Sequence, residues 1–194
     1  MPTIGSRIDP QDTFVLFVDL QTGIVELSKT IPVDRLKRGV LGLSTLAKIF
    51  GMPTIVSGVA GQDGSAPTMI PQLAKGIGEF TIHQRTTADS FRNEAILAAA
   101  KATGRQTLLI SGVSSEVAVQ LPGLTATDMG YRVFVVVDAC GGMSERTEQA
   151  AMQRVIKTGG ATVSVMTLAG ELAGDFHSAE AQAALGVLYE MAAA

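Results

Sequence analysis

The chain alternates between short runs of apolar residues and segments in which apolar residues recur at helical spacing. Runs that are rich in β-branched residues and bounded by turn residues predict strands. We expect six strands, over residues 13–20, 54–57, 80–83, 107–110, 132–138 and 161–166. The first run reads TFVLFVDL and is apolar on both faces, which is typical of a central strand in a parallel sheet.

The segments between the strands predict helices. Within residues 34–50, Leu36, Val40 and Leu43 fall on one face of a helix, and Gly51 provides a stop. Further helices are expected over residues 92–103, 144–158 and 179–191, and over a segment after the fourth strand that ends at Gly130. The last of these helices is rich in Ala and Leu and carries little charge, so we expect it to dock on a neighbouring subunit.

The alternation of strands and helices decides the fold class. It predicts an α/β domain of three layers, in which right-handed crossovers place helices on both faces of a parallel sheet. No linker or internal repeat divides the sequence, so we expect one domain over residues 1–194. The stretch 58–71 is rich in Gly, Ser and Pro and is interpreted as a surface loop.

Composition and charge exclude several classes of function. A net charge of −3 with 17% charged residues gives no basic footprint for nucleic acid, and no apolar run reaches the roughly 18 residues that span a bilayer. Residues 1–12 lack the parts of a secretory signal, so a cytoplasmic location is expected. The single cysteine, Cys140, excludes an intrachain disulfide, and His83 and His177 have no spaced partners, so we expect no metal and no cofactor.

Two charged residues stand where a ligand would bind. Asp19 ends the first strand, and ligands of open α/β sheets bind at the carboxyl ends of the strands. Burial there would raise its pKa and suit it to carry a proton, although an acid that only begins a loop fits the position equally well. Arg85 follows the short third strand and can orient Asp19 or hold an anionic group, but taken alone it favours a surface role.

The segment GVSSEVAV follows the fourth strand. Gly112 permits a tight exit, and residues 114–118 lead into a helix whose first N–H groups can hold an oxyanion. Pro122 cannot donate to the carbonyl of Ala118, so we expect irregular backbone there. Every α/β protein needs such a junction, and alone it favours a purely structural role. Cys140 also ends a strand, but without a nearby base it is interpreted as a small buried residue.

Three motifs together resemble those of a known family. VDLQTG around Asp19, GVSSEVAV, and GYRVFVVVDA after it resemble the isochorismatase-like cysteine hydrolases, over nearly the whole chain. Within that family, the run over residues 116–141 is similar to the YcaC-like branch. The resemblance implies a Rossmann-like, six-stranded parallel sheet, a small-molecule substrate, and a homo-oligomer, either a tetramer or an octamer.

The resemblance also implies a set of site residues. In the family an aspartate, a lysine and a cysteine form a catalytic triad, and Asp19, Arg85 and Ala118 fall on or next to these positions. Gln21 falls on the glutamine of the D-x-Q pattern, and we assign Gln21 and Phe91 to substrate binding. The family has a cis peptide bond before the residue that matches Ser114, and this bond would direct the N–H groups of Ser114 and Ala118 to a substrate oxygen as an oxyanion hole.

Two departures from the family pattern affect the chemistry. Arg85 replaces a lysine, and an arginine stays protonated, but it can still hold Asp19 ionised or bind an anionic substrate. Ala118 replaces the nucleophile, and its methyl group cannot form a thioester.

These departures leave three interpretations. We favour an engineered Cys→Ala variant of a cysteine hydrolase that cleaves amides or other C–N bonds. A natural alanine would instead fit a vinyl-ether hydrolase of the isochorismatase type that uses Asp19 as general acid, or an inactive oligomer that binds a ligand or serves as a scaffold. In each case we expect Asp19 and Arg85 to converge near Ala118.

Overall fold

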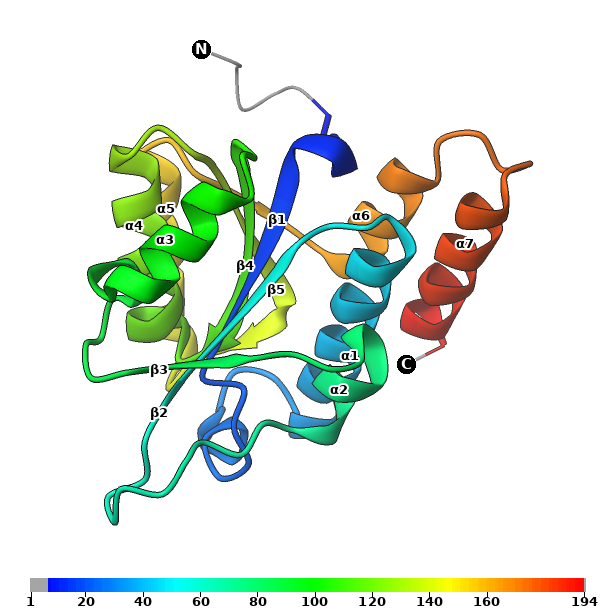
Figure 1. Ribbon diagram of the computed structural model, residues 1–194. Helices are drawn as coiled ribbons and strands as arrows, with labels where there is room; N and C mark the ends of the chain where they lie inside the picture. The colour runs from blue at the N-terminus through cyan, green and yellow to red at the C-terminus, as the bar shows by residue number, and fades with distance from the viewer. Residues whose placement is uncertain (1–6, 194) are drawn as a thin grey trace.

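A computed structural model describes residues 7–193 of the chain (Figure 1). Residues 1–6 lie outside the described residues, and they are the first half of the stretch (residues 1–12) that is expected to lack a secretory signal. Six parallel strands form one sheet in the order β3-β2-β1-β4-β5-β6. The strands are β1 (Thr13–Val18), β2 (Thr54–Val59), β3 (Ile82–Arg85), β4 (Thr107–Val113), β5 (Arg132–Gly141) and β6 (Ala161–Val163).

Helices cover both faces of the sheet, as Figure 1 shows. One face carries α1 (Val33–Ile49), α2 (Pro71–Ile77), α6 (Val165–Ala173) and α7 (Ala179–Ala192). The other face carries α3 (Glu94–Ala102), α4 (Gln120–Asp128) and α5 (Glu145–Lys157). The predicted three-layer αβα architecture with a six-stranded parallel sheet is confirmed.

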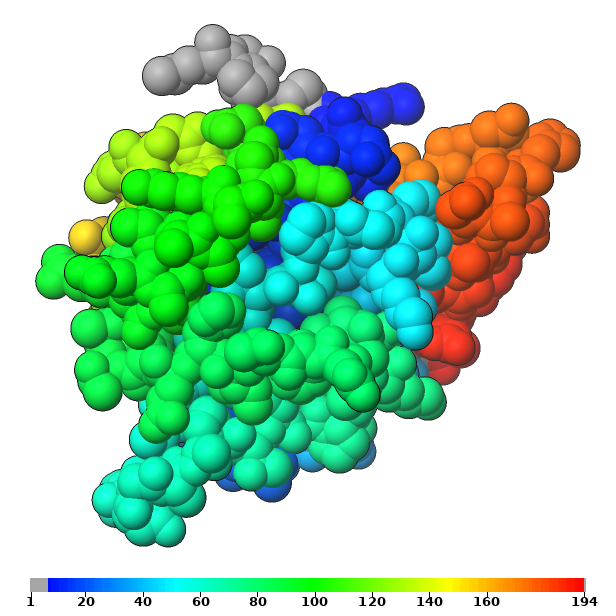
Figure 2. All heavy atoms as spheres, in the orientation of Figure 1, coloured from blue at the N-terminus to red at the C-terminus, as the bar shows by residue number. Residues whose placement is uncertain are grey.

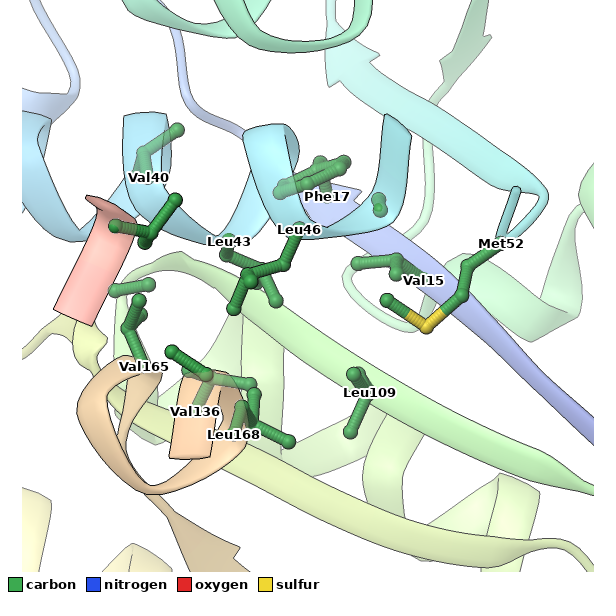
Figure 3. Close-up of a cluster of buried hydrophobic side chains, with 14 of the residues drawn as sticks. Val15, Phe17, Val40, Leu43, Leu46, Met52, Leu109, Val136, Val165 and Leu168 are labelled. Carbon is green, nitrogen blue, oxygen red and sulfur yellow. The ribbon is translucent and has the colours of Figure 1, made fainter. Parts of the chain in front are cut away.

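The central strand β1 is buried on both faces, as its apolar run predicts. Val15 and Phe17 belong to the core under α1, whereas Phe14, Leu16 and Val18 belong to the core on the opposite face. Figure 3 shows Val40, Leu43 and Leu46 of α1 in the first core, with Val15, Phe17 and Leu109 of the sheet. The alternation of side chains along a strand thus builds two cores from one segment.

Helix α1 lies very close to the sheet at one position. A Cβ atom added to Gly39 would overlap the carbonyl oxygen of Asp138 in β5. Only glycine permits this approach, because any larger residue would push the helix away from the strand. The contact fixes α1 over the carboxyl half of β5.

Several stretches differ from the sequence-based expectation. The third strand spans Ile82–Arg85 and not residues 80–83, so Arg85 ends this strand and does not follow it. The strand expected over residues 161–166 ends at Val163, and α6 begins at Val165. Ser164 caps that helix through its hydroxyl, which accepts the N–H of Thr167 at 3.1 Å, and the carboxylate of Asp138 accepts the N–H of Val165 at 2.8 Å. The expected strand was therefore too long, because Val165, Leu168, Ala169 and Leu172 are buried at helical spacing.

The long loop after β2 is a further difference. Strand β2 continues to Val59, and the helix α2 begins at Pro71, so the irregular stretch spans residues 60–70. The N–H of Gly61 donates to the carbonyl of Ser65 at 3.0 Å and closes the tip of this loop. The tip projects from the body of the protein in Figure 2.

The strand order places a topological switch between β1 and β4. The chain proceeds from β1 to β2 and β3 on one side, and then crosses to β4, β5 and β6 on the other. Connections on opposite faces leave a crevice at the carboxyl ends of the two central strands, where ligands of such sheets bind. Val18 pairs with Gly112, so Asp19 and the turn at Ser114 emerge side by side at this crevice.

Candidate active site at the switch between β1 and β4

Asp19 lies directly after β1, with its residue surface only 7% exposed. Its backbone is in the left-handed region (φ 53°), and its N–H donates to the carbonyl of Ser57 at 2.9 Å. Asp tolerates this conformation better than most residues other than glycine. The turn directs the chain out of the sheet and keeps the carboxylate at the strand end.

Arg85, at the end of β3, reaches across β2 to that carboxylate. Its Nη2 donates to Asp19 Oδ2, its Nε donates to the Ser57 hydroxyl at 3.1 Å, and its Nη1 donates to the carbonyl of Thr87. The arginine is only 4% exposed. Three acceptors from three parts of the chain thus hold the planar guanidinium group in one orientation.

The electrostatics of the pair suit proton transfer at Asp19. Burial raises the pKa of the Asp19 carboxyl, while the adjacent Arg85 charge and hydrogen bond act in the opposite direction. Oδ2 is held by Arg85, but Oδ1 is buried and has no hydrogen-bond partner among the described residues. One carboxylate oxygen is therefore fixed, and the other remains to accept a proton or a hydrogen bond.

The backbone after β4 is irregular, as Pro122 predicts. The peptide bond between Val113 and Ser114 is cis, and residues 115–119 form a π-helical turn before α4 begins. The carbonyl of Ser114 accepts the N–H of Val119 at 3.2 Å. Since a proline at position 122 cannot complete the regular helical bond to residue 118, a wider turn replaces the first turn of an α-helix.

Ala118 lies on the inner side of this π-helical turn and is buried. It belongs to the same apolar cluster as Val18, which precedes Asp19, and Phe91. Phe91 itself is stacked on Tyr131, with ring centroids 6.4 Å apart. Phe91 thus packs in the same core as Ala118, and its role in substrate binding stays a prediction.

Gln21 uses its side-chain amide to fasten the edge of the site. Its Nε2 donates to the carbonyl of Val59 at 3.0 Å, and its Oε1 accepts the N–H of Val59 at 2.8 Å. Its backbone also pairs with Met69 in an antiparallel bridge. Gln21 thus joins the segment after β1 to both ends of the long loop, and substrate binding by its remaining N–H stays a prediction.

A cavity of about 320 Å³ opens beside Arg85. Its wall consists of the end of β2 and the turn after β3, and the lining residues are Val59, Ala60, Arg85, Thr86, Thr87 and Ala88. A larger cavity of about 460 Å³ lies between α5 and the end of β5, lined by Ser115 and Cys140 but not by Asp19 or Arg85. The smaller cavity is the candidate substrate site, because Arg85 of the buried ion pair lines it; Asp19 is not among its lining residues.

The comparisons with known proteins identify the family of this chain. The sequence model of the isochorismatase domain matches residues 13–167, which include β1, β4 and all of the residues discussed above. This chain belongs to the isochorismatase family.

Relatives within the isochorismatase family place the chain in the YcaC-like branch. It is 35% identical over 173 residues to the probable hydrolase YcaC of Escherichia coli, a match that covers 89% of this chain and 83% of that protein. The crystal structure of the E. coli YcaC gene product, described as an octameric hydrolase of unknown specificity, superposes with a TM-score of 0.85 over 94% of this chain and 89% of that one.

YcaC from Pseudomonas aeruginosa, solved with hexane-2,5-diol and covalent acrylamide, is 32% identical. It superposes with a TM-score of 0.88 over 97% of this chain and 95% of that chain. The resemblance to the YcaC-like branch is thereby confirmed.

Two further residues complete the description of this family member. Cys140 is buried, its thiol contacts the carbonyl of Ile110 at 3.8 Å, and burial raises its pKa to about 12, so it is no ready nucleophile. Ser57 is the residue that the sequence analysis missed, although it holds both Asp19 and Arg85. Its signal was a polar residue in the middle of the otherwise apolar run TIVSGV.

Neither a metal site nor a membrane span is evident within residues 7–193. No cluster of three His, Cys, Asp or Glu side chains there is arranged to hold a metal ion. None of the helices in the same residues combines the length and the hydropathy required to cross a bilayer.

Proposed function

We propose that this chain carries the site of a small-molecule hydrolase for amide or related C–N bonds, with alanine in place of the cysteine nucleophile. Asp19 is the proton carrier, Arg85 fixes and polarises it, and Ala118 marks the position of the thiol. The observation that carries the proposal is the buried Asp19–Arg85 pair, with one carboxylate oxygen unpartnered, at the switch point that also holds the turn before Ala118.

With cysteine at position 118, the reaction proceeds in two stages. The Asp19 carboxylate takes the thiol proton, and the thiolate attacks the carbonyl carbon while the N–H groups of Ser114 and Ala118 hold the oxyanion. The C–N bond breaks as Asp19 returns the proton to the leaving nitrogen, which leaves a thioester. Water then attacks the thioester, its proton passes to Asp19 and on to the sulfur, and the acid is released.

Alanine cannot perform the first of these stages. Its methyl group carries no ionisable proton and no lone pair, so the chain as written forms no thioester, whether the thiol was removed by engineering or in nature. The names of the relatives support hydrolase chemistry for the cysteine-bearing form: E. coli YcaC is a probable hydrolase, and P. aeruginosa YcaC holds a covalent acrylamide. By the same likeness to an octameric relative, we propose a homo-oligomer.

A second candidate function follows from the raised pKa of the Asp19 carboxyl. A protonated Asp19 can act as general acid on a vinyl ether without any thiol. It gives its proton to the vinyl carbon, water adds to the resulting cation, and the C–O bond breaks to give a ketone and an alcohol. This route uses Asp19 alone and tolerates alanine at position 118.

Restoring the thiol separates the candidates. The chain as written and its Ala118→Cys variant are assayed with a panel of small amides and with isochorismate, and an Ala118→Ser variant controls for the added polar atom. Amide hydrolysis by the cysteine variant only is the expected result. Vinyl-ether cleavage by both chains supports the acid mechanism instead, and binding without turnover by either chain supports an inactive ligand-binding oligomer.

A further inference from the structure

We propose that the cavity between α5 and the end of β5 is a separate binding site, and that it takes a small organic cation, an ammonium group on an apolar body. The cavity measures about 460 Å³, a size that encloses a small molecule. Its lining includes none of Asp19, Arg85 and Ala118. The inference therefore goes beyond the proposed function and does not depend on it.

A bulge in β5 shapes one wall of the cavity. After Val135 the register shifts, so that β5 has four residues, 136–139, where β4 has only Ser111. Pairing of β5 with β6 ends at Val136, so no strand covers the bulge on that side. Bulges are frequent next to functional sites, where they turn a side chain out of its regular direction. Here the bulge brings Val137 out of the core and into the wall of the cavity.

The wall is rich in apolar side chains that remain open to solvent. Val137 is 41% exposed, although the five strand residues before it are buried, and Ile156 of α5 is 49% exposed. Ile31 and Met152 extend the apolar lining between them. Exposed apolar residues that are scattered singly carry no meaning, but a set that surrounds one hollow is typical of a binding site. An apolar ligand group that enters would cover these side chains.

The charge of the lining identifies the ligand. Among the described residues that line the cavity, Asp138 and Glu148 are acidic and none is basic. Burial raises the pKa of the Cys140 thiol, and the negative charges of Glu148 and Asp138 raise it further. Both carboxylates therefore act on the same region of the cavity, which Cys140 also lines. A cation is attracted there, and an anion is repelled.

Neither carboxylate has a cationic partner within residues 7–193. Glu148 Oε1 accepts the Ser115 hydroxyl at 2.6 Å, and the oxygens of Asp138 accept the N–H of Val165 at 2.8 and 3.1 Å. All of these donors are neutral. Burial raises the pKa of the Asp138 carboxyl, an effect that a bound cation would oppose.

The arginines of α1 do not supply the missing cation. Arg35 and Arg38 line an adjoining cavity that also meets Asp138, but neither forms an ion pair with any acid in the described part of the chain. An ammonium ion beside α5 thus meets two carboxylates without a competing cation in the lining. Its three N–H donors, with no acceptor, match carboxylate oxygens that still have free lone pairs.

The test compares three probes of similar shape and different charge. Phenethylammonium, phenethyl alcohol and hydrocinnamate are titrated into the chain as written at neutral pH, and binding is followed by the NMR shifts of the Val137, Met152 and Ile156 methyl groups. We expect phenethylammonium to bind about tenfold more tightly than the alcohol, and hydrocinnamate to bind more weakly than both. The pKa of the Asp138 carboxyl should fall when the ammonium ion is bound.

Three results would overturn the inference. Equal or tighter binding of the alcohol would show an apolar hollow without charge selection, and tighter binding of hydrocinnamate would reverse the assigned sign. Failure of phenethylammonium to shift these methyl groups at about 10 mM would remove the site, and this includes the case in which a second copy of the chain covers this face.

Two charge-removing variants locate the cation. Glu148→Gln and Asp138→Asn each keep an oxygen that can accept the bond from Ser115 or Val165, so the local structure is preserved. Each should weaken binding of phenethylammonium about three- to fivefold and leave binding of the alcohol unchanged. Glu145→Gln, an exposed change on the same helix outside the lining, is the matched control and should have no effect. Unchanged affinity in both test variants would contradict the inference, as would an equal loss in the control.

Discussion

Arg85 Nη2 donates a hydrogen bond to Asp19 Oδ2, although β2 separates the strands from which the two residues come. Both side chains are almost fully buried, and Ser57 of the intervening strand accepts from the same guanidinium group at 3.1 Å. The ion pair therefore depends on the order of three neighbouring strands. Because β3 is an edge strand, the ion pair both helps to hold this edge of the sheet and sets the charge of the candidate site.

We expect Arg85→Met to destabilise the protein by about 3–5 kcal/mol at neutral pH, because it leaves the Asp19 carboxylate buried and unpaired. Loss of the cation raises the pKa of the folded-state carboxyl further above that of the unfolded chain. The folded state then binds the proton more readily, so stability is greatest at acidic pH and is lost as pH rises through the folded-state pKa. Urea unfolding at several pH values measures both effects.

A matched control for Arg85→Met is Lys37→Met, which breaks the exposed pair of Lys37 and Glu26 (3.1 Å). Exposed pairs contribute about 0–1 kcal/mol, so this change should be small. A comparable loss from both variants would contradict the assigned importance of the buried pair.

Gly39→Ala should destabilise the protein by about 1–3 kcal/mol, because the added methyl group overlaps the carbonyl oxygen of Asp138. The control is Gly186→Ala in α7, where an added Cβ meets nothing within 4 Å. That variant should gain about 0.5–1 kcal/mol from better helix propensity. Thermal unfolding of the two variants gives the comparison, and equal shifts in Tm would refute the close approach of α1 to β5.

The Cys140 thiol should not react with a soluble disulfide reagent while the protein is folded, and it should react fully after unfolding in denaturant. Burial raises its pKa from 9.0 to about 12, so the folded protein keeps the proton that an unfolded thiol loses. The contribution of the buried thiol to the free energy of unfolding is therefore fully present below pH 9 and is lost as pH rises towards 12. In Cys140→Ala, the loss of stability at alkaline pH that is due to this thiol should disappear. Rapid labelling of the thiol in the folded protein would argue against its burial.

Gln21→Ala should release the end of β2 without unfolding the core. The variant loses both amide contacts with Val59, at 2.8 and 3.0 Å, so hydrogen exchange at the Val59 N–H should accelerate. Exchange at Leu109 in the centre of the sheet serves as the internal control. Unchanged protection at Val59 would leave substrate binding as the better role for Gln21.

Several errors of the sequence analysis have a common physical cause. The boundary at Ser164 was missed because VSVM suits a strand by its β-branched residues, while the side chain that caps α6 from outside, Asp138, lies far away in the sequence. Ser57 was overlooked because a lone polar residue within a strand acquires meaning only when its partners from β1 and β3 are known.

The sequence by itself determined the alternation of strands and helices, the central position of residues 13–18, the irregular turn before Pro122 and the absence of a thiol at position 118. These properties follow from local patterns, because periodicity, proline and the identity of a side chain act within a few residues. Only the tertiary structure decided that Arg85 is paired with Asp19 and not left at the surface, and that Gln21 is fastened to Val59. Those contacts join strands that are neighbours in the sheet but distant in the sequence, and burial, which sets their electrostatic strength, exists only once the sheet has formed.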